Sequence, residues 1–248
     1  MIVLKTRSEL ELMRIAGRIS AQALRMAGGM VRPGVTTAQI DREIRKFILS
    51  HGAEPSFLGY GGFPASACIS INDVVIHGIP GRRVINAGDI VSIDVGARYK
   101  GYHGDNAATF PAGEISPGAR ALMDATEKSL YKGISQAIAG NRVGDISSAV
   151  QRYVESLGYG VVRKFVGHGV GKKMHEAPEL PNFGKAGTGP RLAVGMTLAI
   201  EPMINLGSGE VKILPDGWTV LTADGGLSAH FEHTVAITEN GPVILTEP

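Results

Sequence analysis

The chain has 248 residues, 44% of them hydrophobic and 19% charged, and its formal net charge is +2. These totals are typical of a folded globular protein and exclude the disordered and fibrous classes. So small a net charge does not favour nucleic-acid binding. No stretch approaches the ~20 apolar residues of a membrane span, and the N-terminal apolar run is too short for a signal peptide. The single cysteine, Cys68, excludes an internal disulfide framework, so we expect a soluble cytoplasmic protein.

The N-terminal part of the chain is predicted to hold two helices and a loop that lines a pocket. A capping box at residues 8–11 begins the first helix, which is predicted to end near Ala27. Thr36 begins the second helix, whose apolar residues recur on one face until Gly52 ends it. Residues 57–64, FLGYGGFP, combine glycines and aromatic side chains in the manner of pocket-lining loops.

Residues 90–110, IVSIDVGARYKGYHGDNAATF, place two acids within a predicted antiparallel hairpin. Asp94 interrupts an apolar, β-branched strand, and Asp105 lies on the strand that returns. Gly96 and Gly101 are expected in the bend. A buried aspartate costs several kcal/mol unless its charge is paired. Two such carboxylates side by side repel each other, so either one is protonated or a cation lies between them.

The rest of the chain is predicted as two more helices followed by a β-rich region. Pro117 fits the first position of one helix, and Asp145 begins another that ends at Gly158. Asn240-Gly241 is a hairpin turn signal. Strands are predicted at residues 67–71, 161–166, 197–204, 211–214, 218–222, 229–237 and 243–245. Because no linker or low-complexity segment divides the chain, residues 1–248 are predicted to form one α+β domain.

An internal repeat divides this domain into two halves, roughly residues 1–140 and 141–248. In each half an acid ends one strand and a second acid begins the strand that returns. Chance resemblance between short apolar strands is the alternative, but acids recur at both equivalent places. Two such halves facing each other would bring four carboxylates to one centre. The matching segments are 88–94 with 195–201 and 105–109 with 232–236, and the four acids are Asp94, Asp105, Glu201 and Glu232.

The four acids and one histidine form a candidate metal centre. His168, flanked by glycines in VGHGVG at residues 166–171, is the expected nitrogen ligand. Such a set suits two divalent ions ~3.5–4 Å apart, bridged by carboxylates and by a water that becomes hydroxide near neutral pH. It favours Mn, Fe(II), Co or Zn. Alone, each residue has a structural alternative, such as a turn-capping aspartate or a hydrogen-bonded loop histidine. Together they fit these alternatives poorly, because all four acids interrupt apolar strands.

These residues belong to a series of motifs that extends over essentially the whole chain. In chain order the motifs are CISIN at residues 68–72, HGIP at 77–80, DVG at 94–96, GD at 104–105, GHGVG at 167–171, HEAP at 175–178, IEP at 200–202 and FEHT at 231–234. In this order and spacing they resemble the type I methionine aminopeptidases, which are metallopeptidases of the pita-bread fold. The resemblance implies an α+β pita-bread fold, in which helices cover a pseudo-twofold antiparallel β-sheet core.

The resemblance also implies a role for each candidate residue. The four acids and His168 match the family's metal ligands, and Glu201 would also act as general base on the bridging water. His175 matches the residue that polarises the scissile carbonyl and stabilises the tetrahedral intermediate, and His77 the one that contacts the scissile nitrogen. By similarity, the pocket for the methionine side chain is lined by Tyr60, Phe63, Cys68 and Trp218, with Phe57 and Met174 beside them, and an accessory Na or K ion is held by Asn72, Val74 and Ser228.

Three positions depart from the family pattern. Phe57 stands where many bacterial members have a cysteine, Phe63 where tyrosine is common, and Met174 where phenylalanine is frequent. None of them removes a ligand, so they bear on the shape of the pocket and not on the reaction.

The expected activity is metal-dependent removal of the N-terminal methionine from peptides and nascent chains. The second residue must be small, because a bulky side chain would crowd the metals. Work near the ribosome follows from the family alone, and we expect a monomer without membrane or specific nucleic-acid partners. One alternative is a proline-specific aminopeptidase or prolidase, which generally carries a large additional N-terminal domain. The other is a non-catalytic pita-bread binding module, a class that loses metal ligands.

Overall fold

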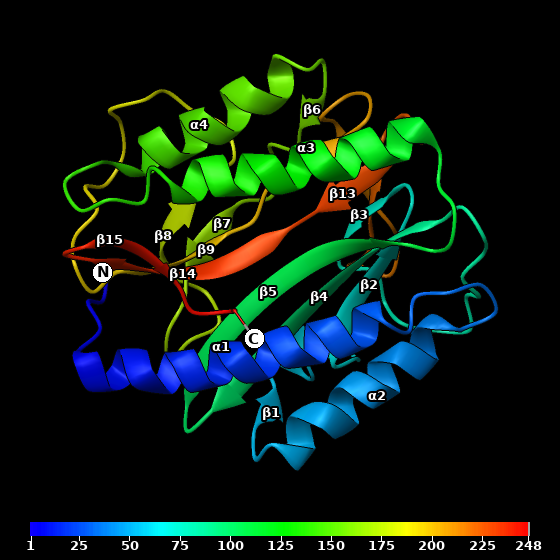
Figure 1. Cartoon of the computed structure of the whole chain (residues 1–248), viewed down its shortest axis with the longest axis horizontal. Coiled ribbons are helices and arrows are strands. Elements are labelled where there is room, and N and C mark those ends of the chain that lie inside the picture. The colour runs from blue at the N-terminus through cyan, green and yellow to red at the C-terminus, as the bar shows by residue number, and fades with distance from the viewer. Residues whose placement is uncertain (248) are drawn as a thin grey trace.

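The centre of the molecule is a curled nine-stranded antiparallel sheet (Figure 1). The computed structural model describes residues 1–247. The strands of this sheet are β1 (Glu54–Pro55), β2 (Ala67–Ile71), β4 (Ile90–Tyr99), β5 (Tyr102–Pro111), β7 (Gly167–Gly169), β8 (Glu176–Leu180), β9 (Thr197–Ile200), β14 (Glu232–Thr238) and β15 (Gly241–Ile244). They lie in the order β1-β4-β5-β14-β9-β7-β8, with β2 paired to β4 and β15 paired to β14.

Two small sheets adjoin the central one. The first contains β13 (Ser228–His230), β10 (Met203–Asn205) and β6 (Gly160–Val161), in that order. The second contains β11 (Val211–Ile213), β12 (Val220–Thr222) and β3 (Val74–Ile76). All strand pairs in the two small sheets are antiparallel.

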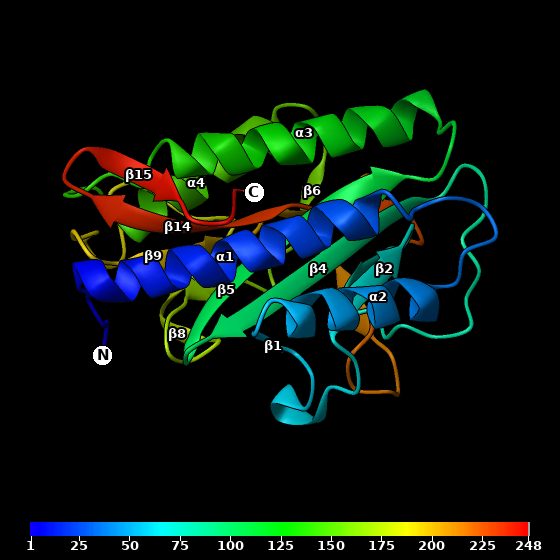
Figure 2. The same ribbon diagram turned by 60° about the horizontal axis from the view of Figure 1, so that its bottom comes forward.

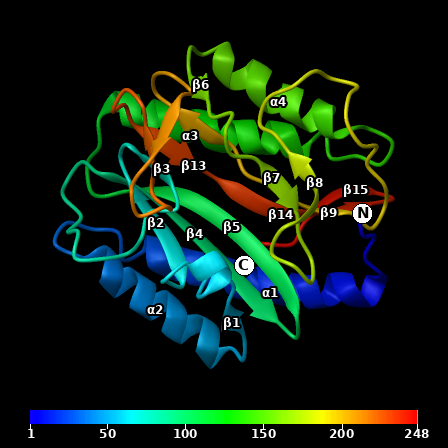
Figure 3. The same cartoon turned by 180° about the vertical axis from the view of Figure 1, so that it is seen from behind.

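Four helices cover one face of the sheet, and the view from behind shows the opposite face free of them (Figures 2 and 3). They are α1 (Arg7–Gly28), α2 (Thr37–Ser50), α3 (Pro117–Ile134) and α4 (Val143–Glu155). The first two pack over β4, β5 and β2, and the last two lie side by side over the strands of the second half. Each pair has its own apolar core, built from fully buried residues such as Ile44 of α2 and Leu122 of α3.

The arrangement confirms the predicted fold class, with two helix-covered halves that meet where β5 pairs with β14. α3 lies before residue 140 in the chain but packs with α4 and the strands of the second half. The change from one apolar core to the other therefore comes before α3.

The helix ends correct two predictions. The capping box of α1 is formed by Thr6 and Glu9, not by residues 8–11, so this helix begins earlier than predicted. α4 begins at Val143, and Asp145 accepts the backbone N–H of Arg142 instead of starting the helix. The starts of α2 at Thr37 and of α3 at Pro117 are confirmed.

The observed strands also differ from several of the predicted ones. Residues 197–204 and 229–237 are each interrupted, at Glu201-Pro202 and at Phe231, where the chain passes between the central sheet and the sheet of β10 and β13. In the predicted strand 161–166 only Val161 is in a strand. β8 was not predicted, because its sequence EAPEL is polar and contains a proline.

The hairpin of β4 and β5 turns at Lys100-Gly101, where φ is 47° and 85°. Gly96 is not in the bend but lies within β4, opposite Asp105. A Cβ atom there would lie 2.7 Å from the Cβ atom of Ser56, so only glycine lets the neighbouring segment approach the strand.

No helix within residues 1–247 is long and apolar enough to cross a membrane.

Two glycines on helices provide a test of how closely α1 packs. A Cβ atom at Gly17 would overlap the carbonyl oxygen of Leu245 and lie 2.8 Å from its carbonyl carbon, whereas at Gly118 of α3 no atom of residues 1–247 lies within 4 Å. We expect Gly17→Ala to lower the free energy of unfolding by about 1–3 kcal/mol through overpacking. Gly118→Ala should be neutral or stabilise by up to about 1 kcal/mol, because alanine is the better helix former. Urea denaturation of the two variants measures the difference, and equal stabilities would contradict the close packing of α1.

Candidate metal centre and substrate pocket

Strand register brings three of the predicted ligands to one face of the central sheet. Asp94 on β4, Ala107 on β5 and Glu232 on β14 lie directly opposite one another. Residues opposite each other in an antiparallel pair point to the same side. Asp105 lies two residues before Ala107 and therefore shares that side. The three carboxylates thus come together because β5 pairs with a strand on each edge.

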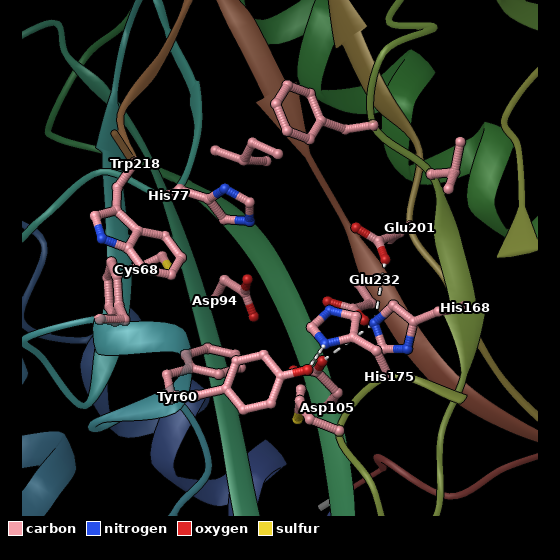
Figure 4. Close-up of a pocket in the computed structure, with 16 residues that line it drawn as sticks. Tyr60, Cys68, His77, Asp94, Asp105, His168, His175, Glu201, Trp218 and Glu232 are labelled. Atoms are coloured by element: carbon pink, nitrogen blue, oxygen red, sulfur yellow. Dashed lines mark hydrogen bonds and ion pairs between the residues drawn. The ribbon is translucent and has the colours of Figure 1, made fainter. Parts of the chain in front are cut away.

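Strand register also places the other two predicted ligands, His168 and Glu201. Ala199 on β9 lies opposite both Thr234 and His168. Thr234 is two residues beyond Glu232 on β14, so His168 points to the side of the carboxylates. Glu201 follows Ala199 by two residues and points the same way, as Figure 4 shows.

The five side chains converge on one point (Figure 4). His168 Nε2 lies 3.5 Å from Glu201 Oε1 and 3.9 Å from Asp105 Oδ2. One ligand atom each of Asp105, His168 and Glu232 lie within 4.8 Å of one another. Because divalent ions bind oxygen and nitrogen at ~2.0–2.2 Å, donors this close can share one ion.

The four carboxylates make this centre electrostatically unfavourable without a cation. Burial raises the pKa of Asp94 to about 7. Burial and, next, the neighbouring carboxylates push the pKa values of Asp105, Glu201 and Glu232 well above the ordinary range. Burial lowers the pKa of His168 to about 3, so its imidazole is neutral and able to ligate a metal. The protein has therefore assembled acids that stay ionised together only if positive charge is supplied.

The hydrogen bonding of these acids fits a metal. Among residues 1–247, three buried carboxylate oxygens have no hydrogen-bond partner, namely Asp94 Oδ1, Asp105 Oδ1 and Glu232 Oε1. Buried polar atoms are almost always hydrogen-bonded, so unpaired oxygens at one point call for a ligand. Several carboxylates and one imidazole are the donors preferred by Mn, Fe(II), Co and Zn. The residues present fit a divalent metal centre.

A small cavity of about 170 Å³ opens beside the carboxylates. All eight residues predicted to bind substrate line it: Phe57, Tyr60, Phe63, Cys68, His77, Met174, His175 and Trp218. Drug-sized ligand sites occupy ~300–1,000 Å³, so this cavity suits a single side chain. Its wall is apolar and aromatic, with Phe63 edge-on to Trp218 at 5.1 Å between ring centroids.

Cys68 lies opposite Asp94 in the sheet. Burial, and next the charge of Asp94, raise the pKa of its thiol well above the ordinary value. Cys68 is therefore a neutral thiol that forms part of the wall and not a nucleophile.

The two predicted catalytic histidines stand on different sides of the cavity (Figure 4). His175 Nδ1 lies 2.7 Å from the Tyr60 hydroxyl, and its ring centroid is 4.1 Å from that of His168. His77 lies edge-on to Trp218 at 6.2 Å between centroids. Burial lowers the pKa of His77 to about 4, so this ring is neutral at pH 7.

The predicted accessory cation site lies where strands β3, β10 and β13 come together. The Ser228 N–H donates to the Asn72 carbonyl oxygen at 2.8 Å, and the Ser228 hydroxyl donates to the Ile204 carbonyl oxygen at 3.3 Å. Val74 begins β3, two residues after Asn72. The three predicted residues are thus neighbours, and cation binding by them stays a prediction.

Sequence reasoning missed His230. Its Nε2 atom lies 3.7 Å from Glu201 Oε2, the residue is 2% exposed, and burial lowers its pKa to about 3. A signal was present, because His230 precedes Glu232 by two residues in an apolar stretch and could share its side. Phe165, Val166 and Ile76, which also line the cavity, carry no comparable signal.

Comparison with known proteins agrees with this geometry. The model of metallopeptidase family M24 matches residues 11–239. A methionine aminopeptidase of Clostridium perfringens is 57% identical over 246 residues, which cover 99% of each chain. The solved structure of a methionine aminopeptidase from Thermotoga maritima has a TM-score of 0.99 and 45% identity, and the match covers 100% of both chains.

A solved prolidase of Pyrococcus furiosus shares the fold at a TM-score of 0.81 and 25% identity, but only 66% of its chain is covered. The methionine aminopeptidases are therefore much more similar than the prolidase, both in identity and in length. With a family model over most of its residues and relatives of this similarity over its whole length, the chain belongs to metallopeptidase family M24 and, within it, to the methionine aminopeptidases.

Proposed function

We propose that this methionine aminopeptidase acts in the cytoplasm on peptides and nascent chains whose second residue is small, with Glu201 as its general base. One observation carries the proposal: four carboxylates and an imidazole converge beside an apolar cavity of the size of one side chain. The polarizable thioether of methionine suits the aromatic walls of that cavity.

The metal centre would be held by Asp94, Asp105, His168, Glu201 and Glu232. The unpaired oxygens of three of these acids support a set of two divalent ions, of Mn, Fe(II), Co or Zn. When bound, such ions polarise the scissile carbonyl and acidify the attacking water.

Glu201 would move the proton of the attacking water. Its Oε1 atom faces His168 and its Oε2 atom faces His230, so two neutral imidazoles flank the carboxylate. With a cation nearby the carboxylate is ionised, so it can accept a proton from the water and then donate that proton to the leaving amine. One side chain can therefore serve both proton transfers of the hydrolysis.

His175 would stabilise the negative charge that develops on the carbonyl oxygen. If its Nδ1 atom accepts the hydroxyl hydrogen of Tyr60, the ring carries its own hydrogen on Nε2. That N–H is then available to donate to the substrate oxygen, which is worth most when the donor is already in place. His77, neutral and on the facing side, would contact the scissile nitrogen.

The remaining expectations rest on the family alone. The accessory site of Asn72, Val74 and Ser228 would take Na or K, and the enzyme would act as a monomer close to the ribosome. Neither competing function has support from the site. A prolidase would resemble the longer Pyrococcus chain more closely, and a binding module would not retain a complete set of ligands in one buried cluster.

Removing the proposed base should nearly abolish turnover. Glu201→Gln keeps the shape of the side chain, and we expect kcat for Met-Ala-Ser to fall about 10²–10⁴-fold after addition of excess Mn²⁺ or Co²⁺. Release of free methionine measures this. The matched change Glu210→Gln, at an exposed residue of the same half, should leave kcat unchanged. Wild-type turnover by Glu201→Gln would remove Glu201 from the mechanism.

The size of the second residue should decide the rate. Met-Gly and Met-Ala peptides should be cleaved well, whereas Met-Leu-Phe should lose about tenfold or more in kcat/KM, because a bulky second side chain would crowd the metals and overpacking costs about 1–3 kcal/mol. Steady-state kinetics on the three peptides tests this. Equal rates would refute the proposed specificity.

Metal binding should compete with protons. Asp94, with its pKa raised to about 7, must lose a proton to bind a metal, whereas His168, with its pKa lowered to about 3, is already neutral. For such a carboxyl the metal-free folded state holds more protons than the unfolded state, so stability falls as pH rises from about 4 to 7. The lowered pKa values of the buried histidines have the opposite effect, because they make stability rise with pH below about pH 6.5. They contribute to stability both with and without metal.

We therefore expect the rise in melting temperature caused by excess Co²⁺ to grow from about pH 5.5 to 7.5. Thermal unfolding with and without metal across this range measures it. Asp94→Asn should make the dependence less steep without removing it, because the pKa values of Asp105, Glu201 and Glu232 are raised as well. A metal-induced shift that does not change with pH would contradict the raised carboxyl pKa.

A further inference from the structure

The loop that joins β7 to β8 ends at His175. On its inner side the His175 ring contacts Tyr60 and His168 in the pocket (Figure 4). The same residue also lines a second cavity, together with Met1, Val3 and Lys5 of the N-terminal segment. The position of His175 therefore also depends on the contacts that the loop makes on the side of the second cavity.

A buried ion pair fixes the loop between β7 and β8 on that side. Lys5 Nζ lies 2.6 Å from Glu176 Oε2, and the two side chains are 3% and 8% exposed. Glu176 directly follows His175 and is the first residue of β8. Its other oxygen, Oε1, accepts the backbone N–H of Lys173 at 3.1 Å. One carboxylate thus joins the N-terminal segment to the loop through separate oxygens.

The N-terminal segment is itself fixed to the sheet. The Lys5 backbone N–H donates to the Gly195 carbonyl oxygen at 2.7 Å, two residues before β9 begins. The ion pair also fills the space behind the loop. A Cβ atom at Gly171 would lie 2.5 Å from Glu176 Oε1 and 2.6 Å from Lys5 Cε. Lys5 therefore connects the loop of His175 to the strand that leads to Glu201.

We infer that Lys5 is a positioning residue for His175, acting through Glu176. This inference rests on the proposed role of His175 at the substrate oxygen. Without the ammonium, the Glu176 carboxylate would be buried unpaired, which is strongly unfavourable. The carboxylate would turn to water and release its bond to Lys173, and the loop would carry His175 out of register with the substrate.

Lys5→Met tests this, because it keeps the apolar stem and removes only the charge. We expect kcat for Met-Ala-Ser per folded molecule to fall about 10–10²-fold, as for a donor displaced by an ångström or less, with KM little changed. Lys5→Arg should restore most of the activity, and the exchange Lys5→Glu with Glu176→Lys part of it. Lys46→Met removes a lysine of comparable ion-pair length, 2.9 Å to Glu43, on the exposed face of α2 and should have no effect.

A second measurement is independent of turnover. Lys172 and Lys173 are exposed in the same loop, and trypsin cleaves after lysine only where the backbone can open. Cleavage at this pair, identified by fragment mass, should be faster in Lys5→Met than in the wild type, and unchanged in Lys46→Met.

His175→Ala is measured beside these variants to separate the two proposals. Wild-type activity of His175→Ala would overturn its proposed role and this inference with it. Impaired His175→Ala together with normal kcat in Lys5→Met would overturn the inference alone. A lower melting temperature of Lys5→Met with unchanged kcat and unchanged tryptic cleavage would also overturn it, since the ion pair would then serve only stability.

Discussion

Everything in this molecule depends on holding four carboxylates together on one face of one sheet. Like charges removed from water repel strongly, and nothing in the local sequence of Asp94 or Glu232 offsets that cost. The stability that compensates for this repulsion comes from other parts of the fold. Two apolar cores on the opposite face, and a helix packed so closely that Gly17 touches the C-terminal segment, hold the strands in register. The fold is stable enough to carry a site that is unfavourable by itself.

The other titratable side chains around the carboxylates are uncharged at neutral pH. His168, His77 and His230 have lowered pKa values because they are buried, and Cys68 has a raised one for the same reason. At neutral pH the cavity therefore holds neutral imidazoles and a neutral thiol around an acidic centre. Such an environment favours a divalent cation at the acids and an apolar side chain beside them, which is what hydrolysis at an N-terminal methionine requires.

Much of this could be predicted from the sequence, because acids within apolar strands are a strong signal. Asp94, Asp105, Glu201 and Glu232 could be found that way, and the repeated pattern predicted that two halves meet. The strand break at Phe231 could not be predicted, because it depends on which sheet each segment joins, whereas Pro202 was a signal for the other break. β8 was missed because its polar sequence becomes a strand only by pairing with β7. The contact of Lys5 with Glu176 joins residues far apart in sequence, for which pattern reasoning has no signal.

The pairing between the two halves has a mechanical consequence. The ladder between β5 and β14 has two residue pairs, Glu232 with Ala107 and His233 with Asn106, and the Thr234 side chain adds hydrogen bonds to the backbone of Asp105. Asp94 and Asp105 lie on one side of this junction, and His168 and Glu201 lie on the other. An ion shared by both sides would act as a removable cross-link that closes the long loop of chain between them. Loop closure of this kind restricts the unfolded chain as a disulfide does, in a protein whose single cysteine cannot form one internally.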